Sequence, residues 1–394
     1  MGAVDENTSA AKARAADFVD RHSATLIDIS HDIHDHPELG FAEVHAHQVL
    51  TDAIENQGIE VERSAFDLDT AFVASVGTEG PNIAVCCEYD ALPGLGHGCG
   101  HNIIAAAGLG AGLAAASLAE ELGGRVTILG TPAEEGGGGK VYMIDRGAFD
   151  GIDAAMMVHP AAFELATMST IAIQRLQVTY TGAAAHAAAA PEQGRNALDA
   201  AVLGYNNVAA LRQHILPEER IHGIFTDAGD KPNIVPARAA AEWYVRSPTL
   251  ASLEPLKERV LRALQAGADA SGCDMTHHWE EPAYADMIDN DPLLNCYAAN
   301  AQTLGRTVVR PTRTETVVGS TDMGNVSHAV PSIHPMIKVA PDGSPIHTPE
   351  FADHARSEHG DQAVVDGAKA MAMTIIDLWA DPSIVDAVQS AHQP

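Results

Sequence analysis

Five short motifs contain the side chains that could do chemistry. Gly96–Asn102 is the densest, because Cys99 and His101 stand one residue apart in a glycine-rich stretch that can turn tightly. Thiolate and imidazole bind zinc and similar divalent ions. A cysteine nucleophile with a histidine base, or a glycine-rich loop with incidental Cys and His, would also account for this motif. The other four motifs are Glu88–Pro93, Thr131–Gly139, His159-Pro160 and Ile346–Phe351.

Glu134 and Glu135 are adjacent carboxylates on a stretch that reads as extended chain. Neighbouring side chains on such a chain point in different directions, so one can bind a metal while the other faces the substrate as a general base. The four glycines that follow would admit substrate closely or form a flexible loop. A phosphate-binding loop is disfavoured, since the stretch has no GK[ST] and the acids would repel phosphate.

The remaining motifs are ambiguous when each is taken alone. Glu88–Pro93 could be a solvated turn, His159 a structural histidine and His347 a loop histidine. Together the motifs supply five ligands of borderline-soft type, enough for two metal ions if one ligand bridges. Two divalent ions can activate a water for hydrolysis, with Glu134 taking its proton and delivering it to the leaving amine. The five ligands are Cys99, His101, Glu135, His159 and His347.

Three of the motifs directly follow short apolar segments. Asn82–Cys87, Arg125–Gly130 and Ala154–Val158 are predicted to be buried strands, because each is a continuous apolar run. A helical pattern precedes them over residues 11–57, with a break at His36–Gly40, and another separates the first two over residues 102–122. Alternating strands and helices predict an α/β domain with a mostly parallel sheet, whose sites lie at the carboxyl ends of the strands.

The order of predicted strands and helices changes near Ile171. Strands are predicted at 174–181, 223–226, 237–246 and 274–279, and helices at 196–214 and 253–268. The order β-α-β-β-α-β is the ferredoxin-like pattern. We therefore predict a catalytic domain formed by residues 1–170 and 283–394, into which residues 171–282 are inserted as a second domain.

Composition excludes several classes of function. The chain has 394 residues and a formal charge of −30, which argues against nucleic acids and anionic membranes as partners. No apolar run reaches the roughly 18 residues of a membrane span, and no secretory signal is visible. Five cysteines without a disulfide-like framework suit a reducing cytoplasm.

The combined motifs resemble the amidohydrolase subfamily of metallopeptidase family 20, and the resemblance covers essentially the whole chain. Asn102 and Thr131 depart from the auxin-conjugate branch and are closer to the p-aminobenzoyl-glutamate hydrolases and the β-alanyl-lysine type dipeptidases. The motifs are His36–Gly40, Asp90–Pro93, His97–His101, Pro132–Glu135, His159-Pro160, Gly182–Ala187, Pro232–Pro236, Gly319–Gly324 and His347–Phe351.

The resemblance implies a phosphorylase/hydrolase-like catalytic domain and a role for each matching residue. Cys99 would bridge two ions, with Glu135 and His347 completing one site and His101 and His159 the other. Glu134 would be the general base. The inserted domain would be a lid that carries most of a homodimer interface. His186 would steady the oxyanion in a neighbouring active site, and Asn233 and Arg246 would bind the substrate carboxylate; an interior structural role for Arg246 is equally open.

The sequence thus predicts a dinuclear metal-dependent amidohydrolase or dipeptidase acting on N-acyl or aroyl amino acids or dipeptides. Zinc suits the ligands best, and manganese, cobalt or nickel fit the same set. Two alternatives stay open: a metal-independent hydrolase using Cys99 and His101, and a catalytically silent binding protein on the same fold. The intact Glu134-Glu135 pair argues against the second.

Overall fold

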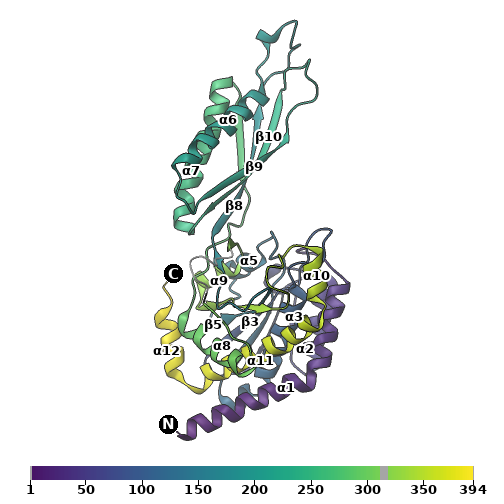
Figure 1. Cartoon of the computed structure of the whole chain (residues 1–394), viewed down its shortest axis with the longest axis vertical. Helices are drawn as coiled ribbons and strands as arrows, with labels where there is room; N and C mark the ends of the chain where they lie inside the picture. Colours follow the sequence, from purple (N-terminus) through teal and green to yellow (C-terminus); the bar gives the residue numbers. More distant parts are fainter. Residues whose placement is uncertain (1, 311–317, 394) are drawn as a thin grey trace. The chain divides into compact units, whose positions relative to one another are not determined.

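The computed structural model describes residues 2–310 and 318–393. The chain divides into two compact units, which are shown in Figure 1. The first unit contains Met1–Ser169 and Met287–Pro394, and the second contains Thr170–Asp286. In the described part of the chain, no helix combines the length and the apolar character needed to span a bilayer.

The first unit is built on a six-stranded sheet in the order β1-β2-β4-β3-β5-β13. Strands β4, β3, β5 and β13 pair in parallel, whereas β1 and β2 are antiparallel, which confirms the predicted mostly parallel sheet. The strands are β1 (Glu62–Arg63), β2 (Phe72–Val76), β3 (Asn82–Cys87), β4 (Arg125–Gly130), β5 (Ala154–Met156) and β13 (Ser332–Ile333). A separate parallel pair joins β6 (His159–Ala161) to β14 (Met336–Lys338). Two further short strands are β7 (Ser169–Thr170) and β12 (Val318–Gly319).

Helices surround this sheet and bury both of its faces. Ile83 and Val85 of β3 belong to the core with helices α1, α3 and α11, whereas Ala84 packs with Met143 of α5 and Met323 of α9. Alternate residues of one strand therefore enter opposite layers, as expected for a buried parallel strand. The helices are α1 (Gly2–Asp35), α2 (Val44–Glu55), α3 (His101–Ala116), α4 (Ala119–Leu122), α5 (Gly139–Asp145), α8 (Asp291–Thr303), α9 (Met323–Ala329), α10 (Pro349–Ala355), α11 (Glu358–Ala380) and α12 (Pro382–Ala391).

Helix boundaries follow local chemistry. Helix α1 ends at Asp35, because Pro37 disfavours a helical conformation at His36. The helical stretch predicted over 102–122 is divided in the structure, since α3 ends at Ala116 and α4 begins at Ala119. Gly108 brings α3 close to the sheet: a Cβ there would lie only 2.8 Å from Cys87 Sγ.

The second unit has the predicted β-α-β-β-α-β order. Its antiparallel sheet has the strand order β11-β8-β10-β9, with α6 and α7 packed on one face through Leu176, Trp243 and Leu264. The elements are β8 (Ala172–Thr181), α6 (Ala197–Leu211), β9 (Arg220–Asp227), β10 (Arg238–Ser247), α7 (Leu250–Ser271) and β11 (Asp274–Trp279). Asn196 caps α6, and Thr249 with Ser252 forms a capping box on α7. Three short 3₁₀ helices are described as well, at Ala65–Asp67, Pro191–Gln193 and Arg212–His214.

Candidate metal centre

The five predicted metal ligands all lie in the first unit, and the structure brings them together. Cys99 Sγ lies 3.3 Å from His159 Nε2, and His347 Nε2 lies 3.2 Å from Glu135 Oε1. One group of potential ligand atoms comes from Cys99, His101 and His159, and another from Cys99, Glu135 and His347; within each group the atoms are at most 4.8 Å apart. Cys99 belongs to both groups, which is the arrangement that a bridging ligand requires.

Special backbone conformations aim these side chains. Gly100 has φ 82° at the start of α3, where glycine adopts the left-handed region without a Cβ penalty. His347 also has a positive φ of 63°, and its N–H donates to the oxygen of Gly98 at 2.8 Å. This bond ties the loop that carries His347 to the loop that carries Cys99, although the two residues are far apart in sequence.

His101 is oriented by a buried carboxylate. Its Nδ1 donates to Asp90 Oδ1 at 2.9 Å, while Asp90 Oδ2 accepts from the backbone N–H of Glu135 at 2.9 Å. The Nε2 atom of His101 is buried and has no hydrogen-bond partner. A histidine held by a carboxylate at one nitrogen, with the other nitrogen unsatisfied, is the usual geometry of a metal ligand.

The chemistry of the donor set fits a divalent metal. Burial raises the pKa of the Cys99 thiol well above its ordinary value, so a thiolate there needs a cation beside it. Burial, followed by the nearby His101, lowers the pKa of His159 to about 4, which leaves its imidazole neutral at pH 7. The Nδ1 of His159 donates to the oxygen of Pro160 at 2.8 Å, so its Nε2 lone pair points toward Cys99.

The two adjacent glutamates differ in environment. Glu134 is buried, with Oε2 3.9 Å from His101 Nε2, and burial together with Glu88 and Glu135 raises its pKa well above the ordinary value. Burial acts in the same direction on Glu135, but the hydrogen bond from His347 and the charge of His101 outweigh it and lower the pKa of Glu135. Glu134 therefore suits proton transfer, and Glu135 suits ligation.

Lys140, Glu88 and Asp322 form a buried cluster of charged side chains next to the site. Its central residue, Lys140, could not be predicted from the sequence. Lys140 is fully buried on α5, with Nζ 2.6 Å from Glu88 Oε1 and 2.7 Å from Asp322 Oδ1. Glu88 Oε2 in turn lies 3.6 Å from His101 Nε2. The sequence placed Glu88 and Asp322 in motifs, but a single lysine at the start of a helix gave no sign that it would be buried.

His334 is a second residue that the sequence did not single out. Its ring centroid lies 5.2 Å from that of His159, its Nε2 is buried without a hydrogen-bond partner, and burial lowers its pKa well below the ordinary value. It follows β13 rather than any of the motifs. Its presence adds a neutral imidazole beside the predicted ligands.

The three remaining predicted residues lie in the second unit. His186 is exposed, and its Nδ1 accepts from the N–H groups of Ala188 and Ala189 at 3.3 and 3.1 Å. The proton of the neutral ring is therefore on Nε2. Asn233 lies in a turn between β9 and β10, where its backbone oxygen accepts from Ala187 N–H at 3.0 Å. Arg246 is on β10, and its guanidinium carbon lies 6.0 Å from the centroid of the Tyr244 ring. Burial lowers the pKa of Arg246.

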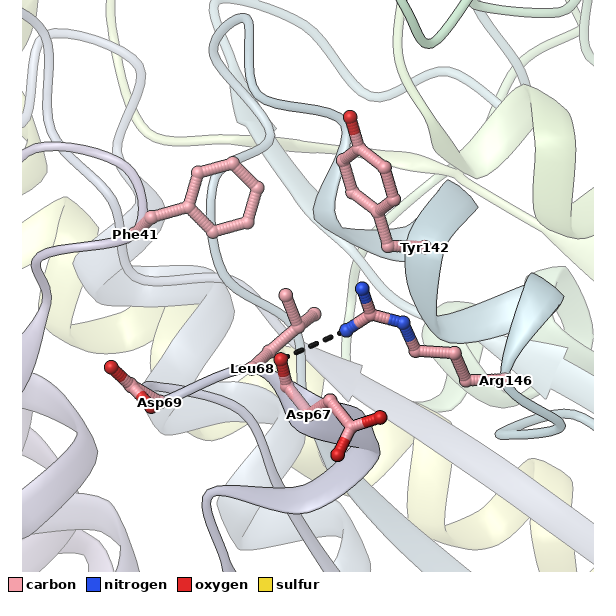
Figure 2. Close-up of a pocket in the computed structure, with 6 residues that line it drawn as sticks. All are labelled: Phe41, Asp67, Leu68, Asp69, Tyr142 and Arg146. Carbon is pink, nitrogen blue, oxygen red and sulfur yellow. Dashed lines mark hydrogen bonds between the residues drawn. The ribbon is translucent and has the colours of Figure 1, made fainter.

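A cavity of about 370 Å³ lies beside the glycine stretch that follows Glu135. Figure 2 shows the rings of Phe41 and Tyr142 on one side of it, with Arg146 bonded at 2.9 Å to the backbone oxygen of Asp67. The lining residues are Phe41, Asp67, Leu68, Asp69, Tyr142 and Arg146. None of the predicted ligands lines this cavity.

A mostly parallel α/β sheet that presents Cys, His and Glu side chains, most of them buried, beside a second carboxylate is typical of metal-dependent hydrolases. The chain belongs to peptidase family M20/M25/M40, whose model matches residues 80–377, and it is a hydrolase of amide or peptide bonds. The family predicted from the motifs is thus confirmed.

Relatives and solved structures agree with this membership. A mouse Xaa-Arg dipeptidase is 38% identical over 96% of this chain and 91% of its own length. One component of the p-aminobenzoyl-glutamate hydrolase of Escherichia coli K12 is 30% identical over 96% of this chain and 94% of its own. A dinuclear metal-binding M20 peptidase from Bacillus subtilis has a similar fold, with a TM-score of 0.71, 20% identity, and coverage of 91% of this chain and 99% of that one.

Proposed function

We propose that this protein is a dinuclear metal-dependent dipeptidase or amidohydrolase. Its substrate would be a dipeptide, or an N-acyl or aroyl amino acid with a free carboxylate. The observation that carries the proposal is the shared position of Cys99, which lies within 4.8 Å of ligand atoms in two separate groups. The names of the mouse and Escherichia coli relatives, a dipeptidase and an aroyl-amino acid hydrolase, support the same substrate class.

The residues that would hold the ions follow from the two groups. Cys99 would lie between them, with Glu135 and His347 on one side and His101 and His159 on the other. When bound, a pair of divalent ions supplies Lewis acidity, which lowers the pKa of water and polarises a carbonyl. Zinc suits thiolate and imidazole best, and manganese, cobalt or nickel would fit the same donors.

Glu134 is proposed as the general base. It accepts the proton of the attacking water as the water adds to the carbonyl carbon, and it then delivers that proton to the leaving amine. Its buried position and its raised pKa suit a carboxylate that accepts a proton and then returns it. Lys140 and Glu88 form a buried ion pair in the wall of the site, and this pair fixes the position of two opposite charges there.

The second unit is proposed to bind and orient the substrate. His186 Nε2 would donate to the oxyanion that forms on the carbonyl oxygen in a neighbouring active site, a role that fits the proton position set by its Nδ1 contacts. Asn233 and Arg246 would bind the substrate carboxylate. The Nε of Arg246 is buried without a hydrogen-bond partner, which supports a polar ligand at that face of the sheet.

We also propose that the second unit forms a homodimer, because it has an apolar edge. Strand β9 is the last strand of its sheet, and Ile224 and Phe225 on it are 68% and 39% exposed. Tyr205 on α6 packs against Phe225 and is also exposed. An unpaired apolar edge strand is a template for pairing with a second copy.

A cytoplasmic location is supported by the five cysteines, all of which are free.

The decisive experiment compares Glu134→Gln with the exposed control Glu120→Gln on a panel of dipeptides and N-acyl amino acids. We expect Glu134→Gln to lower kcat by about 10²–10⁴-fold with the metal content unchanged, since positioned acid–base catalysis contributes that much. The control should match the wild type. Equal turnover of Glu134→Gln and wild type would contradict the mechanism.

Chelation separates the metal mechanism from a metal-independent cysteine hydrolase. The raised pKa of the buried Cys99 thiol disfavours a free thiolate nucleophile. Exhaustive treatment with EDTA should therefore abolish hydrolysis, and added zinc or manganese should restore it. Activity that survives chelation would favour the cysteine hydrolase, and inactivity on every substrate under all metals would favour a binding protein.

A further inference from the structure

A second cluster of ligand-type side chains lies between the end of α1 and the start of α2. Asp32 contacts two histidines: its Oδ1 lies 3.1 Å from His36 Nδ1, and its Oδ2 lies 3.1 Å from His45 Nε2. The two imidazole centroids are 4.3 Å apart, and one ligand atom from each of the three residues falls within 4.8 Å of the others. The groups around Cys99 and His101 share no residue with this cluster.

The residue types define the class of ion that the cluster would take. Two imidazoles and one carboxylate suit zinc, nickel, cobalt or copper, whereas calcium and magnesium prefer oxygen ligands alone. The side chains of Asp32, His36 and His45 are 40%, 56% and 37% exposed, so an ion would enter from solvent and keep water in its remaining positions. The charge of −30 concentrates cations around the protein.

The His36 contacts show what an ion would replace. Its Nδ1 lies 2.8 Å from the backbone oxygen of Asp32 as well as 3.1 Å from Oδ1. A proton on Nδ1 satisfies both oxygens in the absence of an ion. A divalent cation would displace this proton and bring the carboxylate and both rings to one centre.

Residues 37–44, which lie between His36 and His45, form hydrogen bonds with the loops of the proposed catalytic site. The backbone oxygen of Glu38 accepts from Ala91 N–H at 2.8 Å, next to the Asp90 that orients His101. The carboxylate of Glu38 accepts from His45 N–H at 2.9 Å and from Ala46 N–H at 3.1 Å, which caps the start of α2. The chain from residue 37 to 44 therefore joins the second cluster to the loop of Asp90.

The same segment supports the backbone that precedes Glu134. Glu43 is buried, and its Oε1 accepts from Ala133 N–H at 2.8 Å while its Oε2 accepts from Thr70 Oγ1 at 2.7 Å. Ala133 has a positive φ of 59°, a strained conformation for a residue with a Cβ. A Cβ added at Gly40 would lie 2.8 Å from Ala133 Cβ, so the two chains are in close contact.

We propose that Asp32, His36 and His45 form a third, accessory site for a divalent transition-metal ion, which braces the segment 37–44. Asp32 and His36 precede this segment and His45 follows it, so one ion would fix both of its ends. The ion would thereby stabilise the contacts of Glu38 and Glu43 with the loops of Asp90 and Glu134. The site itself stands on its own geometry, and only its link to catalysis rests on the proposed function.

Metal stoichiometry tests the site. Chelated protein is loaded with zinc, passed through a desalting column and analysed for bound zinc, using wild type, His45→Ala, Asp32→Asn and the exposed control His359→Ala. We expect three ions per chain in wild type and His359→Ala, and two in His45→Ala and Asp32→Asn. Equal zinc content in wild type and His45→Ala would overturn the accessory site. Cys99→Ala should keep one ion; if it keeps as many as wild type, the dinuclear proposal fails while the accessory site can still stand.

Hydrogen exchange tests the brace. In the Cys99→Ala background, zinc reaches the accessory site without filling the catalytic centre. Zinc should slow amide exchange at Ala91 and Ala133, which donate to Glu38 and Glu43, and it should have no such effect after His45→Ala is added. Exchange that zinc leaves unchanged at both amides would overturn the bracing role.

Discussion

The two units of the chain hold their candidate functional residues in opposite ways. In the first unit Cys99, His101 and His159 are buried and fixed by their neighbours in the wall of the site, Glu135 is mostly buried, and of the five predicted ligands only His347 is exposed. In the second unit His186 and Asn233 are exposed on irregular chain beside a sheet, held mainly by backbone hydrogen bonds. Under the proposed function, this difference would give a preorganised reaction centre in one unit and adaptable substrate contacts in the other.

Burial also separates the energetic roles of the two regions. Removing a buried ligand leaves other buried polar atoms without a partner, which costs both metal affinity and stability. Removing the exposed His186, which is not among the predicted metal ligands, leaves its neighbours hydrated, so the fold and the metals should be unaffected. Substitution of a buried ligand in the first unit should therefore change metal content and stability. Substitution of His186 in the second unit should change neither of these.

The largest effect is expected from Cys99→Ala. Because Cys99 belongs to both ligand groups, its loss should lower the metal content by two ions per chain and reduce hydrolysis to the background rate. Metal analysis and initial rates on one dipeptide measure both changes. Cys296→Ala, at another free cysteine, is the matched control and should keep full activity. Retention of both ions in Cys99→Ala would disprove the bridging role.

His186→Ala should lower kcat by about 10²–10³-fold, the usual cost of removing one oxyanion donor. Metal content and KM should stay near their wild-type values, since His186 is exposed and far in sequence from every ligand. Steady-state kinetics with metal analysis provide the test, and the exposed His214→Ala is the control from the same unit. If His186→Ala lost metal but kept its kcat, His186 would contribute to metal binding and not to catalysis, which would contradict the contrast between the units.

That the proposed ligands lie close together could be predicted from sequence, because Cys99 and His101 share one short motif and three of the five motifs directly follow predicted strands. Cys99 and His101 stand one residue apart, and Glu134 and His159 come just after apolar runs that became β4 and β5. The order of strands and helices in the second unit could be predicted from its alternation for the same reason. These features depend on periodicity and strand ends, which a single sequence displays.

Other parts of the site could not be predicted, because they depend on contacts between distant segments. Lys140 is buried only because Glu88 and Asp322, 52 and 182 residues away, supply its counter-charges. His334 reaches His159 through the pairing of β13 with β5. The antiparallel strand β2 was missed as well, since its short run of Phe72–Val76 lacks a motif or a clear period.

Asp90→Asn is expected to weaken metal binding by about 10–100-fold, as substitutions of residues that orient a metal ligand commonly do. The carboxylate oxygens of Asp90 accept from both His101 and the backbone of Glu135, so an amide would lose one of these bonds. Competition with a chelator of known affinity measures the change. Asp153→Asn, a second carboxylate that accepts a backbone N–H, is the control and should bind metal normally. Unchanged affinity in Asp90→Asn would show that packing alone positions His101.

The smallest effect we predict is the pH dependence of stability in the chelated protein. Burial, then His101, lowers the pKa of His97 to about 3, and the same causes lower that of His159 to about 4, against 6.5 for an ordinary histidine. The unfolded chain thus binds protons more readily than the folded chain below pH 6.5. The stabilisation is complete above that pH and is lost as the pH falls toward 4 and then 3.

Acid should therefore unfold the first unit before the second, and hydrogen exchange resolved along the sequence can distinguish them. Urea midpoints at pH 7 and pH 4.5 should differ less in His97→Asn than in wild type, because one of the buried histidines with a lowered pKa no longer titrates. Metal loading should reduce the dependence further, since ligation keeps His159 unprotonated over more of this range. An identical pH dependence in His97→Asn and wild type would show that His97 does not contribute, and earlier unfolding of the second unit would contradict the contrast between the units.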